Sequence, residues 1–260
     1  MNVLLNPLAG FVVGFLVGMT GVGGGSLMTP LLVLLFGVAP HTAVGTDLLY
    51  ACITKIFGVG VHRSRGSVDW EVVRRLAYGS LPAAALTVVW FRFTGSSQMG
   101  EGLILNALGI ALVLTSAAMI FKRRLNDIGR RLRSQTPDNF KRSQPLLTVL
   151  AGVILGVLVT LTSIGAGALG AVMLVYLYPF RLNPQKLVGT DLAHAIPLTL
   201  VAGAGQLALG NVDLGLLGLL LTGSIPGVMI GAHFSARAPE AILRNIIAAI
   251  LAVVGLRMLG

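Results

Sequence analysis

Val44-Gly-Thr-Asp-Leu48 recurs unchanged as Val188-Gly-Thr-Asp-Leu192, and two further strings recur at the same spacing. They are Gly66-Ser-Val-Asp69, which returns as Gly210-Asn-Val-Asp213, and Gly79-Ser-Leu-Pro82, which returns as Gly223-Ser-Ile-Pro226. Ahead of them, a glycine-rich stretch at 14–25 parallels 156–167. Four repeated strings in the same order are improbable by chance, so the chain is interpreted as a duplication of one unit.

The composition excludes an ordinary water-soluble protein. Of the 260 residues, 55% are hydrophobic and 11% are charged, and the mean hydropathy is +0.88. A helix that spans a bilayer needs about 20 apolar residues, so about eight to ten such segments fill the chain. The predicted fold class is therefore an all-α polytopic membrane protein without a separate soluble domain.

Each half of the chain carries the same series of apolar runs. The runs of the first half cover about 3–19, 26–38, 40–61, 70–92 and 102–121. Those of the second half cover about 146–162, 167–179, 184–208, 213–233 and 240–259. The second run of each half is too short to span comfortably. We therefore expect about eight full spans, with the first two segments of each half forming a hairpin that re-enters or spans the membrane and has its glycine-rich break at the tip.

The basic residues predict the topology. The formal net charge is +10, but the cations lie in short loops between apolar runs, which favours membrane topology over nucleic-acid binding. Eight of the 19 basic residues fall in one stretch, namely Lys122, Arg123, Arg124, Arg130, Arg131, Arg133, Lys141 and Arg142. The positive-inside rule places this linker, 122–144, in the cytoplasm between repeats 1–121 and 145–260, where anionic lipid headgroups are an additional expected contact.

The same rule predicts that the two repeats are inverted. A hairpin returns the chain to its starting side and three spans then cross, so each half crosses an odd number of times. Inversion brings eight more basic residues to the cytoplasm, namely Arg63, Arg65, Arg74, Arg75, Arg181, Lys186, Arg237 and Arg244. Inverted repeats with broken helices are typical of secondary transporters, whose substrate binds near the midplane.

Several other functional classes lack support in the sequence. Cys52 is the single cysteine, so neither an intramolecular disulfide nor a cysteine metal cluster is expected. The histidines show no metal-ligand spacing, and no nucleotide-binding motif or paired nucleophile and base is present. We expect no enzyme activity, cofactor or metal. The N-terminus lacks the positive region of a signal peptide, so the first helix is expected to be retained.

The glycines serve two predicted purposes. Gly10, Gly14 and Gly18, like Gly152 and Gly156, recur every four residues and predict close helix packing. The cluster at 21–25 is too glycine-dense to continue a helix cheaply, so the helix should break there. A break inside the membrane leaves N–H groups that suit an anion, and hydroxyls stand beside the two breaks, at Thr20, Ser26, Thr162 and Ser163. The alternative is that the glycines only permit a tight turn.

Two carboxylates are expected inside the membrane. Pro40 and Pro184 mark helix starts, which leaves Asp47 and Asp191 about 10 Å into their helices, too deep for N-caps. His194 follows Asp191 by one helical turn, and the two could form a proton-carrying pair. The alternative is that both carboxylates brace the backbone of the broken helices. Their charge argues against direct contact with an anionic substrate.

Other polar or helix-breaking positions have simpler interpretations. Lys55 lies within an apolar run and either attracts an anion, pairs with Asp47 or extends to the cytoplasmic surface. The candidate hinges Pro82 and Pro226 remove a backbone hydrogen bond, and a fixed kink is favoured over a moving hinge. Residues 69 and 213, both Asp, precede helices and are most simply N-caps.

The order of these features resembles the TauE/SafE sulfite-exporter family, also called the 4-toluene sulfonate uptake permeases. The resemblance rests on the glycine-rich break, the duplicated Val-Gly-Thr-Asp-Leu and Gly-Ser-[Leu/Ile]-Pro strings, the basic linker and the length. It implies movement of small sulfur-containing anions, such as sulfite, sulfonates or sulfoacetate, across the cytoplasmic (inner) membrane of a prokaryote. Proton coupling is commonly proposed for this family.

The resemblance also implies a set of site residues. The substrate-binding positions would be Thr20, Gly21, Gly23, Gly24, Gly25, Ser26, Thr46, Thr162, Ser163, Gly165, Gly167 and Thr190, with Asp47, Asp191, His194 and Lys55 as coupling or structural polar residues. The second break has Ser163 and Ala166 in place of Gly21 and Gly24, so the two tips need not contribute equally. The predicted function is a secondary transporter of a sulfur anion that works by alternating access with protons. An anion channel, or a cation transporter that uses both Asp residues, is the alternative.

Overall fold

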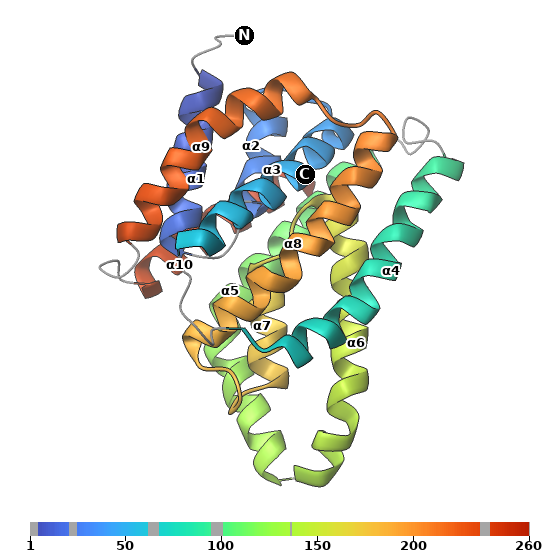
Figure 1. Cartoon of the computed structure of the whole chain (residues 1–260), viewed down its shortest axis with the longest axis vertical. Coiled ribbons are helices and arrows are strands. Elements are labelled where there is room, and N and C mark those ends of the chain that lie inside the picture. The colour runs from blue at the N-terminus through green and yellow to red at the C-terminus, as the bar shows by residue number, and fades with distance from the viewer. Residues whose placement is uncertain are drawn as a thin grey trace.

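The computed structural model describes residues 5–20, 25–61, 68–94, 101–135, 137–234 and 240–259. Within these ranges the chain is helical and contains no strand (Figure 1). The helices are α1 (Leu5–Thr20), α2 (Gly25–Leu34), α3 (Pro40–Val61), α4 (Trp70–Thr94), α5 (Glu101–Gln135), α6 (Pro137–Thr162), α7 (Ala168–Leu177), α8 (Pro184–Ala208), α9 (Leu214–Phe234) and α10 (Glu240–Leu259). The all-α prediction is confirmed.

Proline and glycine place the main helix boundaries where the sequence predicted them. The helices α3 and α8 begin at Pro40 and Pro184. Asn183 is the N-cap of α8, because its side chain accepts a hydrogen bond of 2.8 Å from the backbone N–H of Lys186. Proline at the first helical position costs no hydrogen bond, since that N–H has no partner within the helix.

The second segment of each half is a short helix. Both α2 and α7 have 10 residues, a length of about 15 Å, which is half of a hydrocarbon core of about 30 Å. The break before α7 has left-handed backbone at Ser163 (φ 57°), Gly165 (φ 114°) and Gly167 (φ 141°). In Figure 1, α1 and α2 occupy the upper half and α7 the lower half, and the inverted arrangement of the repeats stays a prediction.

Five described segments are long and apolar enough to cross a membrane. They are Trp70–Thr94, Ile104–Lys122, Arg142–Thr162, Pro184–Ala208 and Leu214–Phe234. Shorter apolar segments lie at Leu5–Met19, Ala168–Leu177 and Asn245–Leu259. Several apolar helices of this kind indicate a multi-pass membrane protein. The expected number of eight full spans stays a prediction.

The basic linker is helical, which makes α5 and α6 longer than the apolar runs predicted. The helix α5 continues to Gln135, and α6 starts at Pro137 (Figure 1). The linker is rich in arginine, which favours a helix. It also packs on the second hairpin: Gly129 lies against the backbone of Tyr176, and the Arg130 guanidinium lies 5.4 Å from the centre of the Phe180 ring.

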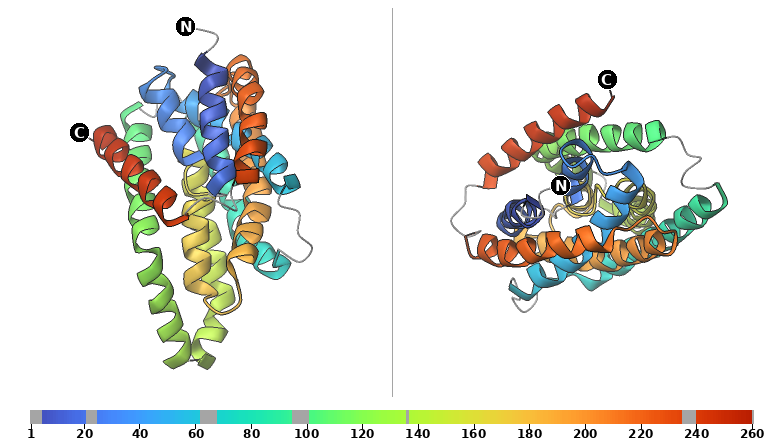
Figure 2. Two further views of the ribbon diagram at one scale, coloured as in Figure 1. Left: turned by 90° about the vertical axis from the view of Figure 1, so that its left-hand side faces the viewer. Right: turned by 90° about the horizontal axis from the view of Figure 1, so that it is seen from above.

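Each half of the chain packs a helix against the other half: α1 lies along α9, and α6 lies along α4 (Figures 1 and 2). Glycines bring the backbones together, because a Cβ at Gly14 would overlap the backbone of Ser224, and one at Gly156 would overlap that of Ser80. Glycines in such contact are Gly10, Gly14, Gly18, Gly223, Gly227 and Gly231 in the first pair and Gly79, Gly152 and Gly156 in the second. The predicted packing role is confirmed.

Matched hydrogen bonds also link the halves. Thr46 Oγ1 accepts a hydrogen bond of 3.0 Å from the backbone N–H of Asp213, and Thr190 Oγ1 accepts one of 2.9 Å from that of Asp69. The two aspartates are N-caps as predicted, since each Oδ1 accepts a hydrogen bond from the backbone three residues later. The repeated threonines therefore fasten α3 to the start of α9 and α8 to the start of α4.

Replacing either threonine by valine is expected to lower the free energy of unfolding by about 1 kcal/mol, because a backbone N–H loses its partner. Thermal unfolding of the purified protein in detergent measures the change. Thr115→Val is the matched control, since among the described residues the hydroxyl of Thr115 bonds within its own helix, to the carbonyl of Ala111 at 2.7 Å. An equal loss in Thr115→Val would contradict a special role for the links between the halves.

Candidate functional site

Three charged side chains are buried between the two halves of the molecule. Asp47 is 0% exposed and Lys55 is 2% exposed, both on α3, and Asp191 on α8 is 3% exposed. The helices α3 and α8 pack together, and the hairpin formed by α6 and α7 packs against both. We call Asp47, Lys55, Ser163, Asp191 and His194 the central polar cluster. A buried charge is costly unless it is paired, so this cluster is the leading candidate site.

Asp47 is held by hydroxyl groups. Thr29 on α2 donates a hydrogen bond to Asp47 Oδ2. The Ser163 hydroxyl, at the tip of the second hairpin, lies beside the same carboxyl without a hydrogen bond of normal geometry. Asp47 Oδ1 and Ser163 Oγ are both buried and have no hydrogen-bond partner among the described residues. Buried polar atoms without partners are uncommon and indicate a place for a ligand or a proton.

Lys55 points into the protein and not toward the membrane surface. Its Nζ donates a hydrogen bond of 2.8 Å to the carbonyl oxygen of Ala166 in the break between α6 and α7. The snorkelling alternative is wrong, because this carbonyl, left free by the broken helix, binds the ammonium inside the protein. The carboxyls of Asp191 and Asp47 both attract the Lys55 ammonium, and the Lys122 ammonium also attracts the Asp191 carboxyl.

His194 pairs with the other half and not with Asp191 as expected. Its Nε2 lies 2.8 Å from the hydroxyl of Ser80 on α4. The sequence placed Asp191 and His194 on one helix face, but the close approach of α4 brings Ser80 within reach. The counterpart of His194 in the first repeat is Tyr50, whose hydroxyl donates to the carbonyl of Gly10 at 3.5 Å.

The predicted substrate-binding residues divide into three groups. Gly21, Gly23 and Gly24 lie outside the described residues, and only the helical backbone of Thr20, Gly25 and Ser26 is described. Ser163, Gly165 and Gly167 form the second tip beside the cluster. The remaining three are Thr46, Thr162 and Thr190, and their hydroxyls are used elsewhere.

The hydroxyls of these three threonines are bonded to the backbone. Thr46 and Thr190 bind backbone N–H groups of the opposite half. Thr162 Oγ1 donates to the carbonyl of Leu158 at 2.6 Å and accepts from the N–H of Ile164 at 3.1 Å, which folds the tip itself. These hydrogen bonds give the three hydroxyls structural partners, and their role in substrate binding stays a prediction.

Two residues of the site were missed. Ser80 belongs to the repeated Gly-Ser-Leu-Pro string, so its duplication was a usable signal. Thr29 has no such signal, because it bonds to Asp47 only through the fold of the first hairpin. The candidate hinges Pro82 and Pro226 lie inside α4 and α9, the helices that pack closely on α6 and α1.

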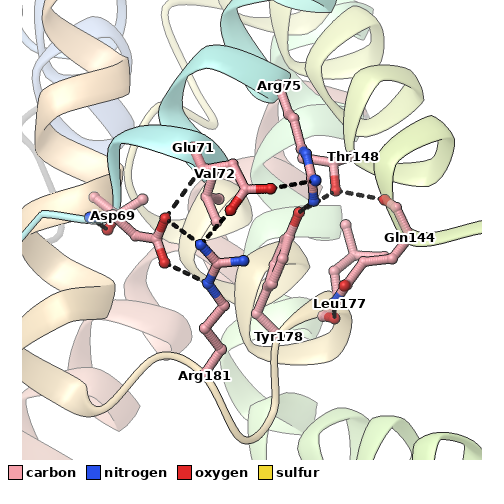
Figure 3. A network of polar contacts seen from close by, with 10 residues as sticks. Asp69, Glu71, Val72, Arg75, Gln144, Thr148, Leu177, Tyr178 and Arg181 are labelled. Carbon is pink, nitrogen blue, oxygen red and sulfur yellow. Dashed lines mark hydrogen bonds and ion pairs between the residues drawn. The ribbon is translucent and has the colours of Figure 1, made fainter. Parts of the chain in front are cut away.

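A second polar network joins the start of α4, the connection between α7 and α8, and α6 (Figure 3). Arg181, in the connection between α7 and α8, donates to the two carboxylate oxygens of Asp69 at 2.5 and 2.8 Å and to Glu71 at 2.6 Å. Two parallel N–H···O bonds from one guanidinium are a strong and directional arrangement. They join the start of α4 in the first repeat to the second repeat.

The network continues from α4 into α6. Glu71 also forms an ion pair with Arg75, whose guanidinium donates to the Tyr178 hydroxyl at 3.3 Å. That hydroxyl lies 2.8 Å from the Thr148 hydroxyl on α6 (Figure 3). From the sequence, only a topological role was predicted for Arg181, because its carboxylate partners lie more than 100 residues away.

Arg181→Gln is expected to loosen this network with little loss of stability. The Arg181 side chain is 40% exposed, and an exposed ion pair contributes less than about 1 kcal/mol. Hydrogen–deuterium exchange should become faster at 68–72 and 178–183, while the unfolding temperature stays nearly unchanged. Arg92→Gln, at the opposite end of α4, is the control. Unchanged exchange in Arg181→Gln would contradict the proposed link.

The described residues contain no group of His, Cys, Asp and Glu side chains that could hold a metal ion. The cluster instead offers one ammonium, two carboxyls, an imidazole and hydroxyls. Such a set can hold a small charged solute and exchange protons with it.

Comparison with known proteins places this geometry in context. The family described as sulfite exporter TauE/SafE matches residues 7–258. The chain is 44% identical to the probable membrane transporter protein YjnA of Bacillus subtilis over 97% of this chain and 98% of that protein. It is 28% identical to the probable membrane transporter protein YdhB of the same organism over 98% and 100% of the two chains. No solved structure gives a significant match.

Proposed function

Because the chain belongs to the TauE/SafE family of membrane transporters, we propose that it moves a small sulfur-containing anion across the cytoplasmic membrane of a prokaryote together with protons. The substrate belongs to the sulfite, sulfonate or sulfoacetate class. The basic linker lies on the cytoplasmic side. The substrate binds in the central polar cluster, and the protein is not an enzyme.

The observation that carries this proposal is the buried Lys55 ammonium at the break of the opposite repeat. An ammonium in the membrane interior attracts an anion, and the hydroxyl of Ser163 can donate a hydrogen bond to an anion oxygen. Sulfite and sulfonates present several acceptor oxygens on one compact group. In this conformation, Lys55 is hydrogen-bonded to the carbonyl of Ala166. When the anion binds, Lys55 would exchange this hydrogen bond for one to the anion.

Transport by alternating access would use the two interlocked halves. The pairs α1 with α9 and α4 with α6 each join one half to the other, so each pair would move as one body. The helix α3 packs against α8 and α9, and α8 packs against α4, so these two helices connect the bodies and carry the charged residues of the cluster. The Arg181 network would open when the site faces the linker side.

A cation transporter is the second candidate, because the two unpartnered atoms near Asp47 are oxygens. Asp47 Oδ1 and Ser163 Oγ resemble part of a sodium site. The nearby Lys55 ammonium repels a second cation, which favours the anion. The two candidates differ in which ion stabilises the purified protein.

Currents from proteoliposomes on a solid-supported membrane test the proposal. Sulfite, sulfoacetate, taurine, thiosulfate, sulfate and chloride are applied in turn at two pH values. We expect a saturable signal with a sulfur anion that changes with the proton gradient; where currents are silent because transport is electroneutral, radiolabel counterflow provides the readout. Stabilisation by sodium with no response to any anion would support the cation transporter. Unsaturable passage of every anion would support a channel.

A further inference from the structure

The two buried carboxyls are not equivalent, although they occupy matching positions of the repeats. Asp191 has two cations acting on it, Lys55 and Lys122. Asp47 has one, Lys55, which also acts on Asp191 and is bonded to the carbonyl of Ala166. The contacts of the Asp47 carboxyl come instead from hydroxyls, and its Oδ1 has no partner among the described residues.

The depth of these groups explains the difference. Lys55 follows Asp47 by about two helical turns, so it lies about 12 Å farther along α3. The helices α3 and α8 pack together, and in the proposed inverted arrangement matching residues lie on opposite sides of the midplane, which would bring Lys55 to the level of Asp191. Thr199 stands at the matching position of α8, so Asp47 gains no corresponding lysine.

Charge balance then limits how an anion can bind. With Lys55 and both carboxyls ionised, these three groups carry one net negative charge. An added anion would leave at least two uncompensated charges in a buried site, and each costs several kcal/mol. Uptake of a proton removes one of them. The proton needs a buried oxygen that is not already used, and Asp47 Oδ1 is such an atom.

We infer that Asp47 carries the coupled proton, whereas Asp191 stays ionised as the lasting counter-ion of Lys55. This inference rests on the proposed transport function and assigns its proton site. Asp47 takes up a proton on Oδ1 when the anion enters and releases it when the anion leaves. The Asp191–His194 pair is not needed for coupling, since Ser80 binds the imidazole.

The surroundings of Asp47 agree with this assignment. On α3, the charged neighbour of Asp47 is Lys55, and a second titratable neighbour is Tyr50. The neighbouring α2 and the α6–α7 tip present uncharged groups, Thr29 and Ser163. On α8, the Asp191 carboxyl attracts the Lys55 ammonium, and this ammonium repels a positive charge on the His194 imidazole. No described group would prevent Asp47 from becoming neutral.

Infrared spectroscopy without substrate tests the proton site directly. The protein in liposomes is titrated from about pH 5 to pH 9, where exposed carboxyls are already ionised, and the C=O stretch of a protonated carboxyl is followed. We expect one titrating band that is absent in Asp47→Asn and present in Asp191→Asn. Its absence from the wild type, its loss only in Asp191→Asn or its loss in both variants would overturn the inference.

A second pair of variants keeps the test decisive if Asp47→Asn does not fold. Thr29→Val removes the hydroxyl that donates to Asp47 Oδ2 and should shift the frequency of the same band. Thr54→Val is the matched control, because its hydroxyl donates to the carbonyl of Tyr50 at 2.8 Å within α3. An unshifted band in Thr29→Val, or an equal shift in Thr54→Val, would overturn the assignment.

Transport measurements separate this inference from the proposed function. Asparagine mimics the neutral carboxyl, so Asp47→Asn should lose accumulation of labelled sulfite driven by a pH gradient, and any exchange of sulfite that it still carries out should no longer depend on pH. Retained accumulation would overturn the inference. If the wild type moves no anion, the proposed function fails, while the infrared titration still reports whether Asp47 binds the proton.

Discussion

Lys55→Met is expected to lower the rate of anion transport by about 100-fold. Leaving a buried charge without the opposite charge that compensates it costs about 3 to 5 kcal/mol, and about 3 kcal/mol corresponds to a factor of about 100. Lys55 is buried, is bonded to the break of the opposite half and is attracted by the charges of two carboxyls. Methionine keeps the volume but leaves the anion without a cation and Asp191 without its counter-ion.

Initial rates of labelled sulfite uptake into proteoliposomes measure this effect. The double variant Lys55→Met/Asp191→Asn removes the two opposite charges together and should recover thermal stability but not transport. If the double variant recovers stability but not transport, Lys55 is needed for anion binding in addition to its structural role. Transport at the wild-type rate in Lys55→Met would remove Lys55 from the substrate site.

Gly223→Val is expected to have the largest effect on stability, because it separates α9 from α1. A Cβ at Gly223 would overlap the backbone of Pro7, and backbone atoms move only if the whole helix shifts. Overpacking costs about 3 kcal/mol at the upper end of the usual range. We expect a clearly lower unfolding temperature in detergent, followed by the fluorescence of the two tryptophans.

Gly218→Val on the same helix is the matched control. A Cβ at Gly218 meets no atom within 4 Å, so this variant should unfold close to the wild-type temperature. The comparison holds residue type and helix constant and changes only the facing backbone. Equal stability of the two variants would show that α1 and α9 are not held by close glycine contact.

The sequence alone determined the helices and the duplication, because both depend on local chemistry. Hydropathy located the apolar runs, and the predicted starts of α3 and α8 at Pro40 and Pro184 are confirmed. The depth of Asp47 and Asp191 inside their helices followed from these starts. The helical linker was missed because its polar composition hid a continuation of α5 and α6.

The tertiary structure alone decided which residues meet. Lys55 bonds to Ala166, 111 residues away, and His194 to Ser80, 114 residues away. Hydropathy does not select such partners, because every apolar helix face is equally compatible with lipid, and close packing of small residues decides which helices pair. The repeated sequence therefore specified two similar halves, whereas the packing between them decided that Asp47 and Asp191 have different neighbours.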